Sequence, residues 1–338
     1  MKKVLSLVIA LVLLCGFAAL AEDSTPKILA CPKSLLGDYW TFNGIGVEQF
    51  GEDFGVNVVW NGPATEGDVQ AQINMCYDMM EAGVQGILIA PNDASAVEEV
   101  ITEAVENGVI VVTWDADTTA PRTCMVNFAE DYALGCEIAE SLVRQMGKEE
   151  GKVALLVGQA GASNHINRAQ GIRDTLAKYP GIEIVVEMDC NDSQDIALSN
   201  AQTILASYDQ IDGFATCSGA EAPAACLAVQ QAVDAGLIEA GSCKVAGSNV
   251  PSSVYDYLKD GSIMSEILTS HPYQLGYAAA WMTNYLIDNG GVVPEVGTRL
   301  EIGDDVFGSP LYLDVVSEDL LLTPLLTVTT ETVDDYDF

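Results

Sequence analysis

The apolar residues of this chain alternate between short continuous runs and longer segments with helical spacing. Runs such as 27–31, 86–90 and 109–113 are rich in Ile, Leu and Val, which is typical of strands covered on both faces of a parallel sheet. The segments between them, for example 43–54 and 68–82, predict helices, each followed by a glycine that suits a left-handed C-cap. This pattern restricts the chain to an α/β fold.

The alternation occurs as two successive series of similar size, so we predict two doubly wound, Rossmann-like parallel-sheet lobes. We assign residues 22–125 and 269–304 to an N-terminal lobe, and residues 126–268 and 305–338 to a C-terminal lobe. No Pro- or Gly-rich linker separates the series, which indicates short hinge crossings. Because ligands collect beyond the carboxyl ends of parallel strands, two facing lobes should form a ligand cleft between them.

The first residues have the features of an export signal. Two lysines precede an apolar run over 4–20, and an Ala-Leu-Ala sequence ends at Ala21, so residues 1–21 read as a cleaved signal peptide. The run is shorter than the roughly 20 apolar residues of a membrane span. A lipid anchor at Cys15 is disfavoured because Leu14, not a small residue, precedes it. We expect an exported protein, periplasmic or extracellular.

Composition excludes two further classes. The chain has 14 Lys and Arg against 49 Asp and Glu, a net charge of −35, so it lacks the cations that bind nucleic acid phosphates. A hydrophobic content of 49% excludes a disordered acidic chain. None of the eight cysteines after the leader forms a C-x-x-C motif, and the two histidines lie far from paired thiols, so we expect mostly buried free thiols, no metal and no cofactor. We expect a soluble monomer.

Charged, amide and aromatic side chains gather where the predicted strands end. Sugar hydroxyls donate to carboxylates and accept from Lys, Arg and amide groups, while aromatic rings cover apolar C–H faces. Any one of these residues alone fits a helix cap or a turn equally well, but their joint placement favours a site for a polyhydroxylated ligand. The candidate ligand-binding residues are Lys33, Tyr39, Trp40, Asp115, Asp117, Asn164, Arg168, Ser218 and Asn249.

Enzyme motifs are weak. The chain has no phosphate-binding GxxxxGK[ST] and no GxSxG, and Gly44-x-Gly46 falls inside a predicted helix and lacks a third glycine. Asp115 and Asp117 are two residues apart, so on an extended segment they point to opposite faces and do not form a glycosidase pair. His165 has no nucleophile beside it. We therefore predict a binding protein, with an extracellular glycosidase as the enzyme alternative.

Several short segments carry a resemblance to a known family. They are Pro32-Lys33, Tyr39-Trp40, Asn61-Gly62-Pro63, Val112 to Asp117 and the C-terminal Tyr336-Asp337-Phe338. With them, the chain resembles the type I periplasmic sugar-binding proteins of ABC importers, over nearly all of its length after the leader. It is most similar to the branch with rhamnose-binding and autoinducer-2-binding proteins. The resemblance implies capture of a sugar or polyol by lobe closure and delivery to an ABC transporter permease, or, alternatively, to a chemoreceptor or histidine kinase.

The resemblance also implies roles for individual residues. Lys33 and Asp115 match a ligand-binding Lys and Asp of the autoinducer-2 branch. The neighbouring Asn164-His165, together with Cys217 and Gly219, departs from that branch, which argues against autoinducer-2 itself.

Three further positions can be compared with the wider family. Arg168 resembles an Arg that pentose and hexose binders use on hydroxyls, Asn249 stands where an Asp is common, and His271 replaces an Asp or Gln. We expect stacking by Tyr39 and Trp40 and hydrogen bonds from Lys33, Asp115, Arg168 and Asn249, with Asp117, Asn164 and Ser218 behind them.

Overall fold

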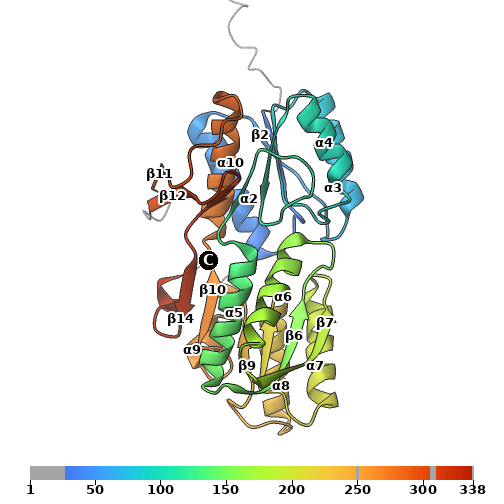
Figure 1. Cartoon of the computed structure of the whole chain (residues 1–338), viewed down its shortest axis with the longest axis vertical. Helices are drawn as coiled ribbons and strands as arrows, with labels where there is room; N and C mark the ends of the chain where they lie inside the picture. The colour runs from blue at the N-terminus through green and yellow to red at the C-terminus, as the bar shows by residue number, and fades with distance from the viewer. Residues whose placement is uncertain (1–26, 249–250, 305–309, 337–338) are drawn as a thin grey trace, which may run out of the picture.

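The computed structural model describes residues 27–248, 251–304 and 310–336. These residues form two α/β lobes, one above the other in Figure 1. The predicted signal peptide and Asn249 lie outside the described ranges. Within those ranges, none of the helices combines the length and apolar character that a membrane span requires.

The N-terminal lobe contains an eight-stranded sheet in the order β11-β12-β13-β5-β4-β3-β1-β2. The strands from β2 to β13 in this order run parallel, and β12 and β11 are antiparallel additions at the edge. Its strands are β1 (Ile28–Cys31), β2 (Val58–Trp60), β3 (Gly86–Ile89), β4 (Ile110–Trp114), β5 (Cys124–Asn127), β11 (Arg299–Asp304), β12 (Pro310–Val315) and β13 (Leu320–Leu322).

Helices cover both faces of this sheet. The helices α2 (Asp38–Phe54) and α10 (Pro272–Asp288) pack on one face, and α3 (Val69–Glu81) and α4 (Glu98–Glu106) on the other. Alternate residues of β1 enter the two resulting cores, which explains why the strand reads as a continuous apolar run. The helix predicted from residue 43 begins at Asp38, so its first turn carries two of the aromatic site candidates.

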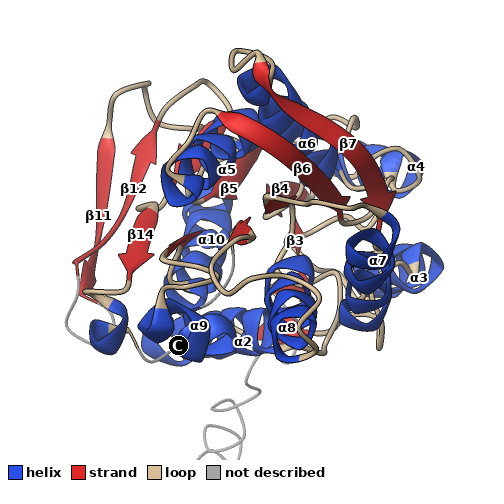
Figure 2. Cartoon of the chain, turned by 90° about the horizontal axis from the view of Figure 1, so that it is seen from below, coloured by secondary structure: helices blue, strands red, loops and turns tan. Residues whose placement is uncertain are grey.

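The C-terminal lobe has a parallel four-stranded sheet in the order β7-β6-β8-β9. Helices α5 and α6 cover one face, and α7 and α8 the other (Figure 2). A bridge between Ser248 and Leu268 links the β9 end to the antiparallel pair β10-β14. The elements are α5 (Asp131–Met146), β6 (Glu150–Val157), α6 (Ser163–Leu176), β7 (Gly181–Asp189), α7 (Gln194–Ser207), β8 (Gly213–Thr216), α8 (Glu221–Asp234), β9 (Lys244–Ala246), η1 (Pro251–Val254), α9 (Tyr255–Asp260), β10 (Glu266–Thr269), β14 (Leu326–Thr329) and η2 (Val333–Asp335).

The predicted lobe boundary differs from the observed one near the C-terminus. Strands β12 and β13 belong to the N-terminal sheet, where Leu321 pairs with Val126 of β5, and only the chain from β14 onward lies in the C-terminal lobe. Leu311, Leu313 and Val315 alternate into the large core of that sheet. The assignment of all residues after 304 to the C-terminal lobe is therefore wrong. The short apolar run of β13 pairs with the edge of β5, and that of β12 pairs with β13.

The described chain passes between the lobes three times, each time through a short segment. The crossings are residues 128–130, 270–271 and 323–325. Short crossings were predicted from the lack of a linker, and three of them in parallel keep the two lobes close together. The α/β fold with two doubly wound lobes is confirmed.

In each lobe, the two helices on one face of the sheet meet at glycines. A Cβ atom on Gly46 of α2 would lie 2.1 Å from a carbonyl oxygen of α10, and one on Gly276 of α10 would lie 2.2 Å from a carbonyl oxygen of α2. A Cβ atom on Gly135 of α5 would lie 2.1 Å from the carbonyl oxygen of Arg168, and Gly171 of α6 is equally close to α5. The backbones therefore touch, which fixes the positions of α5 and α6 relative to each other.

The cysteine prediction agrees with the structure. All eight thiols from Cys31 to Cys243 are free in the described part of the chain, and all but Cys136 are buried. Burial raises the pKa of Cys76 to about 12, so this thiol behaves as a small apolar group.

Candidate ligand-binding site between the lobes

A cavity of about 850 Å³ lies between the lobes, at the carboxyl ends of the strands. Its volume is in the range of small-molecule sites. The loops after β1, β2 and β4 line it from the N-terminal lobe, and α6 with the loops after β7 and β8 lines it from the C-terminal lobe. The cleft predicted from the strand pattern is therefore present.

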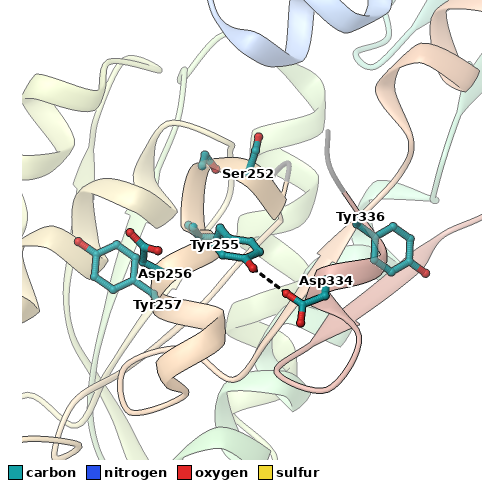
Figure 3. A pocket seen from close by; sticks show the side chains of 8 residues that line it. Ser252, Tyr255, Asp256, Tyr257, Asp334 and Tyr336 are labelled. Atoms are coloured by element: carbon teal, nitrogen blue, oxygen red, sulfur yellow. Dashed lines mark hydrogen bonds between the residues drawn. The ribbon is translucent and has the colours of Figure 1, made fainter.

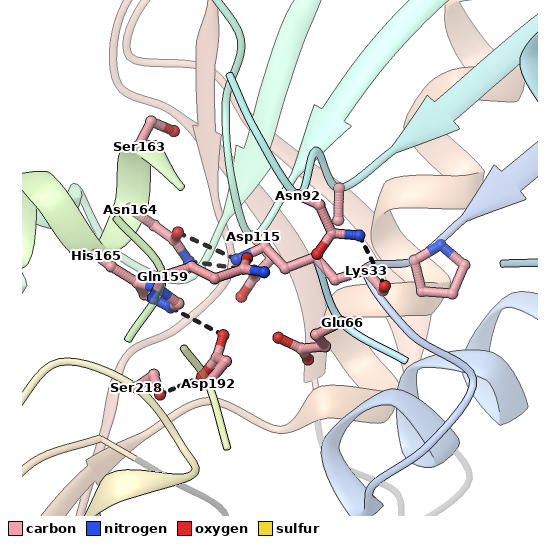
Figure 4. A network of polar contacts seen from close by, with 12 residues as sticks. Lys33, Glu66, Asn92, Asp115, Gln159, Ser163, Asn164, His165, Asp192 and Ser218 are labelled. Carbon is pink, nitrogen blue, oxygen red and sulfur yellow. Dashed lines mark hydrogen bonds and ion pairs between the residues drawn. The ribbon is translucent and has the colours of Figure 1, made fainter. Parts of the chain in front are cut away.

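A buried polar triad joins the lobes at this cavity (Figure 4). The Lys33 ammonium lies 3.2 Å from Asp115 Oδ2 and donates to Asn164 Oδ1 at 3.1 Å. Asn164 Nδ2 in turn donates to Asp115 Oδ2 at 3.2 Å. Burial alone would lower the pKa of Lys33, but the carboxylates of Asp115 and Asp192 raise it above its usual value. The lysine therefore stays charged inside the protein.

A second layer of amides holds the loop that carries Lys33. Asn92 Nδ2 donates to the Lys33 carbonyl at 2.9 Å, and Gln72 Nε2 donates to the carbonyls of Pro32 and Ala90 at 2.9 and 2.8 Å. Gln72 Oε1 accepts from the backbone N–H of Asn92. These bonds satisfy buried backbone groups at the ends of β1 and β3 and orient the lysine.

The second cation of the site is Arg168 on α6. Its Nε donates to Asp131 Oδ1 at 3.0 Å, its Nη2 lies 2.9 Å from the same oxygen, and Nη1 donates to the Cys217 carbonyl at 3.2 Å. The guanidinium carbon lies 5.5 Å from the centre of the Phe128 ring. Burial raises the pKa of Asp131 to about 6, although Arg168 opposes this shift. The glycine contact between α5 and α6 brings Asp131 and Arg168 together.

The two aromatic candidates line the cavity from α2. Tyr39 donates its hydroxyl proton to Asp115 Oδ1 at 3.0 Å, and Trp40 Nε1 donates to Glu66 Oε1 at 2.6 Å. Trp40 is 4% exposed and packs edge-on against Trp114, with 6.0 Å between ring centroids. Most of the Trp40 ring therefore belongs to the core, and Tyr39 offers more surface to a ligand.

An acidic group of residues lies on the other side of the cavity. The Ser218 hydroxyl lies between the carboxylates of Asp192 and Glu221, and Glu221 also accepts from the Ser218 N–H at 2.7 Å. His165 Nδ1 accepts from the Gln159 N–H at 2.8 Å, so the proton is on Nε2, which lies 3.5 Å from Asp192. Burial lowers the pKa of His165 to about 4, so the imidazole is neutral.

Backbone strain is concentrated at this cavity. Among the residues that the structure describes, the non-glycine residues with positive φ are Asp115 (61°), Asn191 (49°) and Asp192 (52°). All three line the cavity. Such conformations cost about 1–3 kcal/mol each and occur mainly at functional sites, and Asp and Asn tolerate them best.

The structure brings most of the predicted residues together. Lys33, Tyr39, Trp40, Asp115, Arg168 and Ser218 line the cavity, and Asn164 joins Lys33 to Asp115. Asp117 does not line it, because its carboxylate accepts from Arg122 Nε and Nη2 at 2.9 and 2.6 Å outside the cavity. Asn249 lies outside the described residues.

Several residues of the site or its immediate support were not among the candidates, including Asp192, Glu66, Phe128, Asp131 and Glu221. Asp192 lies just after a strand, β7, so the rule that selected the other candidates, a polar residue at the carboxyl end of a strand, could also have selected it. Glu66, Phe128, Asp131 and Glu221 lie in loops or at helix starts, where no spacing pattern separates them from surface acids or core residues. These four residues can be recognised as part of the site only from the residues that they contact in the folded protein.

A second cavity, of about 730 Å³, lies within the C-terminal lobe and is lined by η1, α9 and the C-terminal segment (Figure 3). Tyr255 donates its hydroxyl proton to Asp334 at 2.6 Å, and Lys259 pairs with the other oxygen of the same carboxylate. Lys259 already pairs with the Asp334 carboxylate, and only one lobe contributes residues to the lining. The cavity between the lobes is the better candidate site.

Comparisons with known proteins agree with this geometry. The family model of the periplasmic binding protein domain matches residues 28–291. The xylitol-binding protein of Mycolicibacterium smegmatis is 25% identical over 249 residues, which cover 73% of this chain and 66% of that protein. The D-allose-binding periplasmic protein of Escherichia coli is 23% identical over 269 residues, 78% of this chain and 85% of that protein.

A solved structure shows the same fold. The ABC transporter solute-binding protein of Clostridium phytofermentas, with bound L-rhamnose, has a TM-score of 0.80 at 22% identity and covers 92% of this chain and 98% of its own. The family resemblance predicted from the sequence is confirmed by the matched family model. By its matched domain, two-lobed fold and cavity between the lobes, the chain belongs to the periplasmic binding protein family, with the type I architecture.

Proposed function

We propose that this chain is an exported solute-binding protein that captures a sugar or sugar-like polyol between its lobes and delivers it to the permease of an ABC transporter. The observation that carries the proposal is the triad of Lys33, Asp115 and Asn164, in which charged and amide groups from both lobes meet at one cavity. Ligand hydroxyls that bind these groups bind both lobes at once, so they stabilise the closed arrangement over an open one.

The relatives support this class of ligand, since their names specify xylitol and D-allose, and the solved structure holds L-rhamnose. The donor set of this cavity also fits hydroxyl groups. It offers a lysine and an arginine as donors, carboxylates as acceptors and the Tyr39 ring as an apolar surface.

A ligand panel tests the proposal. We expect at least one of rhamnose, ribose, xylose, galactose, inositol, xylitol and autoinducer-2 to raise the melting temperature, and calorimetry to give one site per chain. The same samples are assayed for product, because turnover would identify a hydrolase instead. Stimulation of uptake by vesicles that contain the permease tests the delivery step. Docking to a receptor or kinase in place of the permease would support sensing.

The site assignment predicts different effects for two neighbouring carboxylates. Asp115→Ala removes the partner of Lys33 in the cavity, so ligand affinity should fall about 30-fold or more. Asp117→Asn, which changes a carboxylate that is paired with a cation outside the cavity, should leave affinity within about threefold of wild type. Calorimetric titration of both variants gives the comparison. Unchanged affinity in both Asp115→Ala and Arg168→Ala would refute the assignment.

A further inference from the structure

The charges of the cavity are not balanced on its two sides. Lys33 and Arg168 are each paired with a carboxylate, Asp115 and Asp131 respectively. On the side formed by Glu66 and Asp192, backed by Glu221, no Lys or Arg of the described chain forms an ion pair with any of the three carboxylates. We call these three residues the acidic side.

The acidic side also has too few hydrogen-bond donors. Ser218 has one hydroxyl proton, yet its oxygen lies between the carboxylates of Asp192 and Glu221. Glu66 Oε1 accepts from Trp40, but its Oε2 is buried without a hydrogen-bond donor among the described residues. Figure 4 shows Glu66 and Asp192 turned toward each other from opposite lobes. Two facing carboxylates require a proton, or a positively charged donor, between them.

The titration behaviour agrees with this geometry. Burial, and then the Asp192 carboxylate, raise the pKa of Glu66 well above its usual range. Burial raises the pKa of Glu221 to about 8. Burial would also raise the pKa of Asp192, but His165, a hydrogen bond with Glu66, and Lys33 hold it below its usual range. The raised pKa values of Glu66 and Glu221 thus favour protonated carboxyl groups on the acidic side.

We propose that the ligand carries a protonated amine that lies between Glu66 and Asp192, so that the preferred class is an amino sugar or amino polyol. This inference rests on the proposed function and specifies its ligand. An ammonium group has three N–H donors, which match Glu66 Oε2 and the Asp192 carboxylate, while the hydroxyls of the ligand face Lys33 and Arg168. Among the described residues, no three His, Cys, Asp or Glu side chains are arranged to hold a metal ion, so an organic cation fits better.

Matched ligands of one ring size test the proposal. Glucosamine, galactosamine, mannosamine and their 6-amino-6-deoxy isomers are titrated against the parent hexoses, the N-acetyl derivatives and the uronic acids at about pH 6.5. We expect at least one amino sugar to bind about 10- to 100-fold more tightly than its parent, because a desolvated ion pair is gained. N-acetylation should remove the gain, and uronic acids should bind most weakly.

A variant links the preference to the acidic side. Glu66→Gln keeps the shape and the acceptor for Trp40, and should reduce the preference for the amine to below about threefold, while Asp117→Asn keeps it. Calorimetry in buffers of different ionisation enthalpy should show proton release on binding of the amino sugar, because the ammonium displaces the proton between Glu66 and Asp192.

The outcomes separate the two proposals. If parent sugars bind as tightly as every amino counterpart, the amine assignment is wrong and the proposed function stands. A preference that persists in Glu66→Gln, or binding without proton release, would also overturn the assignment. If no sugar, amino sugar or polyol binds, both proposals fail.

Discussion

Replacing Arg168 by methionine is expected to lower the free energy of unfolding by about 3–5 kcal/mol and to abolish detectable ligand binding. Arg168 is 4% exposed, and its guanidinium is the cation that pairs with Asp131, at 2.9 Å. Without it, a buried carboxylate has lost its counter-charge, and the cavity has lost one of its two cations. Urea unfolding at pH 8 measures the loss of stability, and calorimetry with the ligand that the panel identifies measures the loss of binding.

The stability loss should depend on pH with a definite sign. The pKa of Asp131 is already raised to about 6 by burial, and removing Arg168 raises it further. A carboxyl group with a raised folded-state pKa takes up a proton on folding, so the penalty is largest above that pKa and shrinks as the pH falls toward the unfolded value near 4. The variant should therefore lose less stability at pH 5 than at pH 8.

A double variant separates stability from binding. Arg168→Met with Asp131→Asn leaves no unpaired charge, so we expect it to recover more than half of the lost stability and to lose the pH dependence. Ligand binding should remain absent, because Arg168 lines the cavity. If the double variant is as unstable as the single one, the ion pair is not the cause. If it binds ligand, Arg168 is not part of the site.

Gly135→Ala is expected to destabilise the protein by about 2 kcal/mol and to weaken ligand binding as well. The new Cβ would lie 2.1 Å from the carbonyl oxygen of Arg168, so the backbones of α5 and α6 must separate. Alanine's higher helix propensity offsets only about 1 kcal/mol of this cost. Because α6 carries Asn164 and Arg168, its displacement moves two side chains of the site.

The neighbouring residue provides the control for this variant. Cys136→Ala lies one position further on α5 at a half-buried site that already has a Cβ, so its effect should stay below about 1 kcal/mol with affinity unchanged. Thermal unfolding and ligand titration of the two variants give the comparison. Wild-type stability and affinity in Gly135→Ala would show that the close helix contact does not position the site.

Much of the fold could be predicted because hydrophobic periodicity is a local property. The strands predicted over 27–31 and 86–90 are observed as β1 and β3, and the helix predicted over 68–82 is observed as α3, each within one or two residues at its ends. Boundaries differed most where capping and turns decide them, as at the start of α2, which begins after Gly37. Strand β5 was missed because no helix separates it from β4, so it does not fit the alternation of strands and helices, and Cys124–Asn127 contains only one β-branched residue.

The site could be predicted only in part, for a related reason. Parallel strands bring their carboxyl ends to one edge, so residues directly after strands, such as Lys33 and Asp115, are recognisable in the sequence. Asp117 follows the same strand, yet Arg122 takes its carboxylate away from the cavity. The positions of Glu66 and Asp131 could not be predicted in this way, because Glu66 lies within a loop and Asp131 at the start of helix α5.

The sequence by itself determined the α/β class, the two series of strands and helices and the cleft between two lobes. These features depend on the local spacing of apolar residues, which needs no knowledge of contacts. Only the tertiary structure decided that β12 and β13 join the first lobe, that Asp131 pairs with Arg168 and that Glu66 faces Asp192. Strand pairing and ion pairing depend on distances in space between segments far apart in the chain, and that is why one sequence alone does not reveal them.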